Sequence, residues 1–144
     1  MIYSDGLIKL EKSLSNIINA DRNEELQNRI GVGLQAKVLM GFRKSTSPYG
    51  EKWKPVKRKR GKGENQPLID TGRLRDSISF KLSDNQIILG SNMEYAVVHN
   101  EGLAPVKYKR QFLPDADNLP SDLDDLIEDE ILNFINDQIA FLRN

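Results

Sequence analysis

The chain has 144 residues, of which 38% are hydrophobic, so it carries enough apolar side chain for one modest core and predicts a single domain over residues 1–144. Cysteine is absent, which excludes a disulfide framework, thiolate metal sites and a cysteine nucleophile. No apolar run reaches the roughly 18 residues that span a bilayer, and residues 1–21 alternate apolar with charged side chains, unlike a signal peptide. We therefore expect a soluble protein made in a cytoplasm, with no membrane partner.

The net charge of zero hides a strong asymmetry along the chain. Residues 43–76 contain eleven Lys or Arg against four Asp or Glu, whereas residues 115–144 contain nine acids against Arg143 alone. One interpretation is that these are two solvated surfaces that attract one another within the fold. The other is that opposite charges meet across copies of the chain, or that the basic segment contacts nucleic acid.

The N-terminal part of the chain predicts two amphipathic helices. The apolar face of the first comprises Leu7, Leu10, Leu14 and Ile17. The second begins near Asp21 or Asn23, both good N-cap residues. Its apolar face comprises Leu26, Ile30, Leu34, Val38 and Phe42. Gly31 and Gly33 lie inside this pattern and each costs about 1 kcal/mol of helix propensity, which predicts a close helix crossing or a kink.

Residues 45–67 predict a long, flexible basic loop, because proline and glycine punctuate a stretch rich in Lys and Arg. Mobility is expected over residues 57–66. The run Lys57-Arg58-Lys59-Arg60 is a candidate phosphate contact, with Tyr49 and Trp53 available to stack on bases. We favour the alternative that the run docks on an acidic protein surface, such as the C-terminal helix of a neighbouring copy. Trp53 itself is expected to hold the loop against the core or a partner.

A small sheet and two short elements are predicted next. Asp70 or Thr71 is placed to cap a single helical turn, and apolar residues then alternate with polar ones over 78–82 and 86–89, as in a β-hairpin. Residues 95–99 favour a short helix over a strand. A further short strand is expected at 110–113.

A long amphipathic helix opens at Pro120-Ser121 and is expected to cover the sheet. Its stripe comprises Leu123, Ile127, Ile131, Phe134, Ile135, Gln138, Ile139 and Leu142. The whole pattern predicts an α+β fold, with N-terminal helices and a long C-terminal helix packed against a small antiparallel β-sheet.

Few residue patterns suggest chemistry. A single histidine cannot form the two-histidine spacing of common zinc sites, and the acids of residues 122–129 lack the glycine turn of a calcium loop, so we interpret them as a solvated helix face. His99 with Asp70 or Asp76 and Ser77 would make a hydrolytic triad, but no nucleophile-elbow sequence accompanies them. We therefore expect no catalytic residue, no cofactor and no metal. His99 is interpreted as a structural or subunit-contact residue.

Several short motifs follow one another in a set order. They are Pro48-Tyr49-Gly50-Glu51-Lys52-Trp53-Lys54-Pro55, Leu68-Ile69-Asp70-Thr71-Gly72-Arg73-Leu74-Arg75-Asp76-Ser77-Ile78, Ile88-Leu89-Gly90-Ser91 with Tyr95-Ala96-Val97-Val98-His99-Asn100-Glu101-Gly102, and Arg110-Gln111-Phe112-Leu113. Their succession resembles the phage virion morphogenesis family, which includes Mu-like proteins and the tail-completion proteins of contractile-tailed phages. The resemblance implies an α+β fold without catalytic activity. It also implies a small late protein that finishes the tail end facing the head, typically as a ring.

The resemblance further implies where the protein works and what it contacts. The expected partners are other copies in a homo-oligomeric ring and the tail tube or head connector proteins, with DNA contact secondary. The expected location is the bacterial host cytoplasm during assembly, and then the tail or neck of the virion. The candidate subunit or partner contacts are Trp53, Lys57, Arg58, Lys59, Arg60, Arg73, Arg75, His99 and Arg110.

The same interpretation assigns positions to several other residues. Gly72 permits a tight turn, and Leu74 and Ile78 point inward. Tyr95 and Phe112 are expected in the core rather than at a subunit contact.

Overall fold

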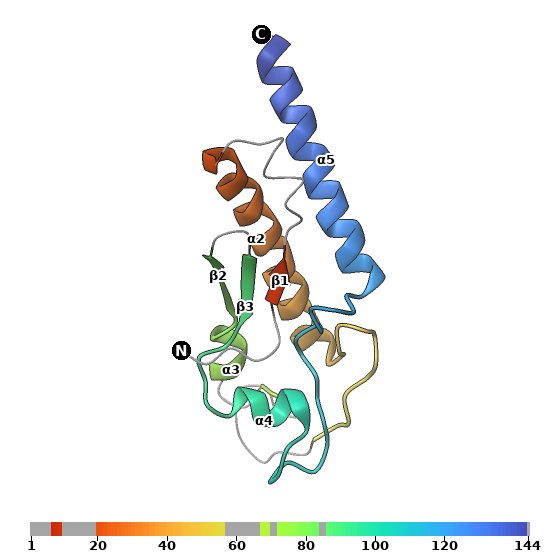
Figure 1. Cartoon of the computed structure of the whole chain (residues 1–144). Helices are drawn as coiled ribbons and strands as arrows, with labels where there is room; N and C mark the ends of the chain where they lie inside the picture. Colours follow the sequence, from red (N-terminus) through yellow and green to blue (C-terminus); the bar gives the residue numbers. More distant parts are fainter. Residues whose placement is uncertain (1–6, 10–19, 57–66, 70–71, 84–85, 144) are drawn as a thin grey trace.

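The computed structural model describes residues 7–9, 20–56, 67–69, 72–83 and 86–143 (Figure 1). In chain order the elements are β1 Leu7–Lys9, α2 Ala20–Lys44, α3 Arg73–Asp76, β2 Ser79–Ser83, β3 Gln86–Gly90, α4 Ala96–Glu101 and α5 Ser121–Arg143. Two long helices and a small antiparallel sheet confirm the predicted α+β class. No helix in the described part of the chain is both long and apolar enough to cross a membrane.

The sheet has three antiparallel strands in the order β1-β3-β2. β2 and β3 form the predicted hairpin, in which Phe80 lies opposite Leu89 and Leu82 lies opposite Ile87. Ile87 and Leu89 are fully buried, since alternate residues of a strand share one face and this face of β3 meets the core.

The predicted first helix is wrong at its start, because residues 7–9 form β1. Leu7, Ile8 and Lys9 pair with Ile88, Ile87 and Gln86 of β3. This pairing satisfies backbone N–H and C=O groups along the edge of β3 that does not face β2. The spacing of apolar residues did not reveal the strand, because three residues are too few for periodicity to distinguish strand from helix. The remainder of that predicted helix, residues 10–17, lies outside the described residues.

α2 packs against β2 and β3 on one side and against α5 on the other (Figure 1). It begins at Ala20, slightly before the predicted start, and continues unbroken to Lys44. A Cβ on Gly31 would overlap the Phe80 ring of β2, and a Cβ on Gly33 would lie 3.0 Å from Leu126 Cδ2 of α5. The two glycines therefore allow the sheet and α5 to approach opposite sides of α2, which confirms the predicted close helix crossing. The apolar face of α2 is fully buried at Leu26, Ile30, Leu34 and Phe42.

α5 runs antiparallel to α2 and packs along it (Figure 1). Leu123 and Phe134 point into the core, where they are 3% and 0% exposed. The C-terminal helix was expected to cover the sheet; it packs mainly on α2, and α2 in turn packs on β2 and β3. Its last turns extend past the beginning of α2 in Figure 1.

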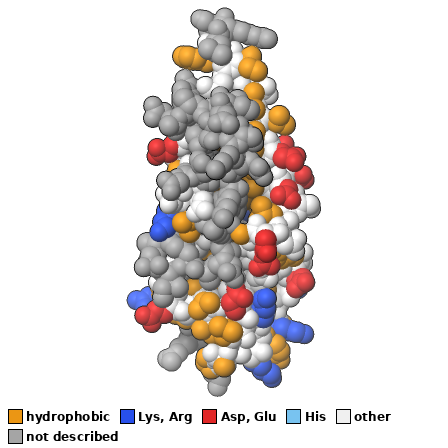
Figure 2. Space-filling model, viewed as in Figure 1, with side chains coloured by type: hydrophobic (Ala, Val, Ile, Leu, Met, Phe, Trp, Pro, Cys, Tyr) orange, Lys and Arg blue, Asp and Glu red, His pale blue; other side chains and the backbone are white. Residues whose placement is uncertain are grey.

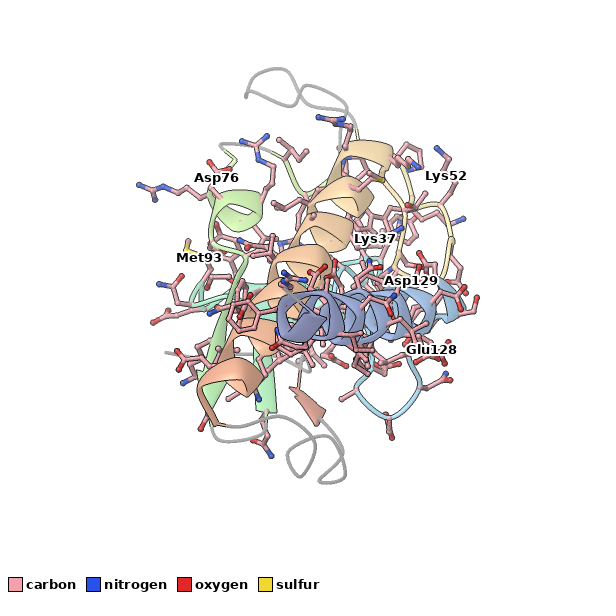
Figure 3. The ribbon with its side chains drawn as sticks, turned by 90° about the horizontal axis from the view of Figure 1, so that it is seen from above. Lys37, Lys52, Asp76, Met93, Glu128 and Asp129 are labelled. Atoms are coloured by element: carbon pink, nitrogen blue, oxygen red, sulfur yellow. The ribbon has the colours of Figure 1, made fainter. Side chains whose placement is uncertain are left out.

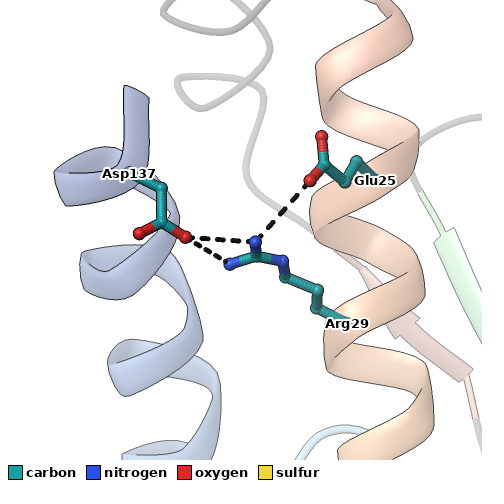
Figure 4. Close-up of polar contacts among 3 residues, drawn as sticks. All are labelled: Glu25, Arg29 and Asp137. Carbon is teal, nitrogen blue, oxygen red and sulfur yellow. Dashed lines mark hydrogen bonds and ion pairs between the residues drawn. The ribbon is translucent and has the colours of Figure 1, made fainter. Parts of the chain in front are cut away.

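The two long helices are also joined by charge (Figure 4). Nη1 and Nη2 of Arg29 each lie 3.1 Å from Oδ2 of Asp137 on α5, and Nη2 lies 3.6 Å from Oε1 of Glu25. The same guanidinium lies over the Phe134 ring, 5.6 Å from its centroid. Arg29 thus combines an ion pair with packing on the aromatic residue that α5 buries.

The short elements follow the prediction in part. α3 is a single turn, and its N-cap position is Gly72 at φ +87°, a left-handed conformation that glycine tolerates. The N-cap is therefore not at the predicted position, and Asp70 and Thr71 lie outside the described residues. Leu74 and Ile78 are 4% and 2% exposed, which confirms that both point inward. α4 confirms the short helix expected near residues 95–99.

Candidate assembly surface

The first part of the predicted basic loop is held against the core by Trp53. The side chain is 6% exposed, its Nε1 donates a hydrogen bond to Gln111 O at 2.9 Å, and its ring meets Phe42 edge-on with centroids 5.5 Å apart. Thr46 and Lys52 form an isolated antiparallel bridge that closes the turn before it. The expectation that Trp53 holds the loop against the core is confirmed, whereas its contact with another subunit stays a prediction, for which its burial leaves little exposed side chain.

Tyr49 attaches the same loop to the segment that precedes α5. Its hydroxyl donates to Asn118 O at 2.7 Å and accepts a hydrogen bond from the backbone N–H of Asp115 at 2.9 Å. Burial raises the pKa of this hydroxyl above its usual value of 10.0. Since Trp53 is buried and the Tyr49 hydroxyl is engaged, the expectation that both aromatic residues stack on bases is not supported. The run Lys57, Arg58, Lys59 and Arg60 lies outside the described residues.

Arg110 is likewise turned inward, with 8% of its surface exposed. Nε donates to Lys54 O at 3.0 Å and Nη2 to Pro55 O at 3.5 Å, while its backbone N–H donates to His99 O at 3.1 Å. Arg110 therefore joins the loop before residue 56 to the end of α4. Contact of Arg110 with another subunit stays a prediction, and only a small part of its surface is exposed to make one.

Asn100 organises the segment in which a strand was expected. Its Oδ1 accepts hydrogen bonds from the backbone N–H groups of Phe112 and Leu113, each at 3.0 Å, and Nδ2 donates to Glu101 Oε1 at 2.9 Å. The strand predicted at 110–113 is wrong, because this side chain satisfies backbone groups that a neighbouring strand would otherwise pair. Asn100 is 1% exposed. Nothing in the sequence pattern distinguished it from the other polar residues of its motif.

An exposed aromatic residue beside Arg110 was also missed. Lys54 Nζ, Lys107 Nζ and Arg110 Cζ lie 6.0, 5.3 and 5.8 Å from the centroid of the Tyr108 ring, which is 38% exposed. Three cations from two separate segments therefore surround one ring. The signal in the sequence was the basic run around Tyr108, although the contribution of Lys54 depends on the fold.

The remaining candidates do not gather at one place. Arg73 and Arg75 lie on α3, where Arg75 Nε donates to Asp76 Oδ1 at 2.8 Å. His99 lies half-buried on α4, and its ring meets Tyr95 edge-on with centroids 6.1 Å apart. Tyr95 is 40% exposed, so its predicted place in the core is wrong, whereas Phe112 is 1% exposed as expected.

The groups considered for a hydrolytic triad contact other partners. Ser77 Oγ donates to Leu74 O at 2.6 Å and lies 2.6 Å from Ser91 Oγ. The Asp76 carboxylate faces Arg75. Asp70 lies outside the described residues, and the described groups offer no Ser–His–Asp arrangement.

The acids of residues 122–129 on α5 are solvent-exposed, as expected of a solvated helix face. They are Asp122, Asp124, Asp125, Glu128 and Asp129. Lys37 of α2 lies 3.8 Å from Asp122, so some of this charge is compensated within the fold. Over the described stretches, no group of three acidic or histidine side chains is arranged to hold a metal ion.

Comparison with known proteins agrees with the motifs in the sequence. The phage virion morphogenesis family matches residues 6–121. The Mu-like prophage FluMu G protein 2 of Haemophilus influenzae is 29% identical over 107 residues, which cover 72% of each chain. No solved structure matches the chain. The match over most of the chain shows that this protein belongs to the phage virion morphogenesis family and has a role in building a phage particle.

Proposed function

We propose that the protein is a structural, non-enzymatic component that completes the tail or the head–tail junction of a phage or prophage particle, and that it does so as a ring of identical copies. The observation that carries this proposal is that exposed acids follow α5, whereas exposed Lys and Arg side chains lie farther from the C-terminus. Figure 2 shows Asp and Glu side chains along the flank where α5 lies; near the end of the molecule away from the C-terminus, Lys and Arg side chains lie among further Asp and Glu side chains.

This separation suits a ring because each subunit of a ring offers two different surfaces that fit one another. Opposite charges on those surfaces attract one subunit to the next and fix the orientation in which they bind. The tail tube and the head connector are the proposed partners of the assembled ring. The proposed contacts with them include Arg73, which is exposed on α3, and Arg75, which is half-buried beside Asp76.

The role is tested by deleting the gene from an inducible phage or prophage and imaging the induced lysate by electron microscopy. The proposal expects separate heads and unfinished tails, with intact virions restored by the wild-type gene in trans. The protein should also be detected by mass spectrometry in purified complete virions. Normal, infective particles from the deletion strain would contradict the proposal.

The alternative is a nucleic-acid-binding module that uses residues 57–62. It predicts DNA affinity that falls steeply with salt and is lost when Lys57, Arg58, Lys59 and Arg60 are neutralised. The burial of Trp53 weighs against base stacking at this loop, so the assembly role is preferred. A fluorescence-anisotropy titration with duplex and single-stranded DNA at two salt concentrations separates the two functions.

A further inference from the structure

α5 carries a second stripe, on the side that faces away from α2. It consists of Asp125, Glu128, Asp129, Leu132 and Ile139, which we call the outer stripe. At 3.6 residues per turn these positions share one face, opposite Leu123 and Phe134, which point into the core. Leu132 and Ile139 are 58% and 43% exposed, so the stripe is acidic near the start of α5 and apolar towards its end. Figure 3 labels Glu128 and Asp129 on this helix.

The loop that follows α4 offers a surface of the opposite kind. Exposed residues of this loop, Leu103, Lys107, Tyr108 and Lys109, form the surface together with Lys54 of the loop before residue 56, and we call it the basic corner. Leu103 and Tyr108 are 50% and 38% exposed, and the three lysines are exposed around them. This surface therefore also combines apolar side chains with charge, but with the opposite sign to the outer stripe.

The basic corner is held in shape by several contacts. Leu103 N–H donates to Val98 O at 3.0 Å, and Arg110 N–H donates to His99 O at 3.1 Å, so both ends of the loop are fixed to α4. Gly102, at φ +71°, brings its backbone so close to Lys109 that a Cβ there would lie 2.7 Å from Lys109 Cβ. A surface that is already ordered loses little conformational entropy when a partner binds.

We propose that the basic corner of one copy docks on the outer stripe of α5 of the next copy, so that copies join head to tail. This inference rests on the proposed assembly role and names the surfaces that would carry it. Lysines of the corner would face Asp125, Glu128 and Asp129, while Leu103 and Tyr108 would cover Leu132.

The position of the two surfaces requires a second copy. The loop after α4 lies at one end of the molecule, whereas α5 extends towards the other end (Figure 1). Among the described residues, the acids of the outer stripe form no ion pair within the chain; the acids of α5 that do so are Asp122 and Asp137. Contact between two different surfaces is heterologous, and it generates a closed ring when the rotation between copies closes.

Charge reversal tests the contact directly. One variant carries Lys107→Glu and Lys109→Glu in the corner, and the other carries Asp125→Lys and Glu128→Lys in the stripe. Each alone places like charges opposite one another and should weaken self-association by about tenfold or more in sedimentation velocity. Matched controls, Lys81→Glu on β2 and Glu24→Lys on α2, change exposed charges outside both surfaces and should associate as the wild type does.

Mixing the variants gives the decisive result. In an equimolar mixture each reversed surface finds a complementary one on the other variant, so association should return, and a single chain with all four changes should self-associate. Circular dichroism confirms that each variant is folded. Unchanged self-association of the single-surface variants, or no recovery of association in the mixture, would overturn the contact. The proposed role in completing the particle would still stand if virions fail to form when the gene is deleted. A wild type that remains monomeric up to about 1 mM would also overturn the contact.

Discussion

Arg29 on α2 and Asp137 on α5 form a two-pronged contact, in which Nη1 and Nη2 each lie 3.1 Å from the same carboxylate oxygen (Figure 4). Both side chains are partly exposed, at 35% and 59%, so water and salt screen the ion pair. Arg29 also packs over Phe134. The contact between the two long helices therefore depends more on the packing of Arg29 than on its charge.

Removing the charge of Asp137 should cost little stability. We expect Asp137→Asn to lower the free energy of unfolding by less than about 1 kcal/mol, and Arg29→Ala to lower it by more because the packing on Phe134 is also lost. Urea denaturation measures both, with Asp124→Asn on the exposed side of α5 as the matched control. If Asp137→Asn lowered the free energy of unfolding as much as Arg29→Ala, the ion pair rather than the packing of Arg29 would hold the two helices together.

Asn100 should contribute more to the free energy of unfolding than its small side chain suggests. Asn100→Ala leaves the backbone N–H groups of Phe112 and Leu113 buried without their acceptor, and we expect a loss of about 2–4 kcal/mol of unfolding free energy. Asn92→Ala, at an exposed asparagine, should change stability by less than about 0.5 kcal/mol. Equal, small effects of the two substitutions in chemical denaturation would show that Asn100 does not organise this segment.

Trp53 is the single tryptophan of the chain, so its fluorescence reports directly on the loop that it holds. We expect blue-shifted emission and weak quenching by iodide in the native protein, because the ring is buried against Phe42. Trp53→Phe keeps an aromatic ring but loses the hydrogen bond to Gln111, which should cost about 1–2 kcal/mol, whereas Trp53→Ala should cost about 3–5 kcal/mol. Emission typical of a water-exposed indole in the folded protein would contradict this placement.

Tyr49 makes stability depend on pH in the alkaline range. Burial raises the pKa of its hydroxyl in the folded state, so its neutral form is favoured there, and this contribution is present below pH 10.0 and lost as pH rises through the folded pKa. Tyr49→Phe removes the titrating group. The difference in unfolding free energy between wild type and Tyr49→Phe should be constant at neutral pH and shift against the wild type above pH 10.0. A constant difference at all pH values would exclude the effect.

The sequence predicted those features that repeat along the chain. The apolar face of α2, the β2–β3 hairpin and the length of α5 each follow from periodicity over many residues. β1 was missed because three residues carry no period and its strand state depends on pairing with β3, more than seventy residues away in sequence. The strand expected at 110–113 was wrong because one buried amide, on Asn100, supplies the backbone partners.

The candidate site was harder to predict than the fold. Positive charge alone placed Arg110 among the surface contacts, but its guanidinium reaches the backbone carbonyls of Lys54 and Pro55, which only the folded chain brings near. The same folding surrounds Tyr108 with cations from separate segments. The spacing of residues in the sequence indicates which side chains share one face of a helix or strand. It does not indicate which residues of separate loops come into contact.

If copies of this chain assemble through surfaces of opposite charge, sedimentation velocity of the wild-type protein will depend on both protein concentration and salt. Samples over a wide range of concentration are compared at about 50 mM and about 500 mM salt, since screening shortens the reach of exposed charges as salt rises. We predict a concentration-dependent species much larger than the 16.4 kDa chain at low salt and a shift towards the single chain at high salt. A 16.4 kDa particle under every condition would contradict it.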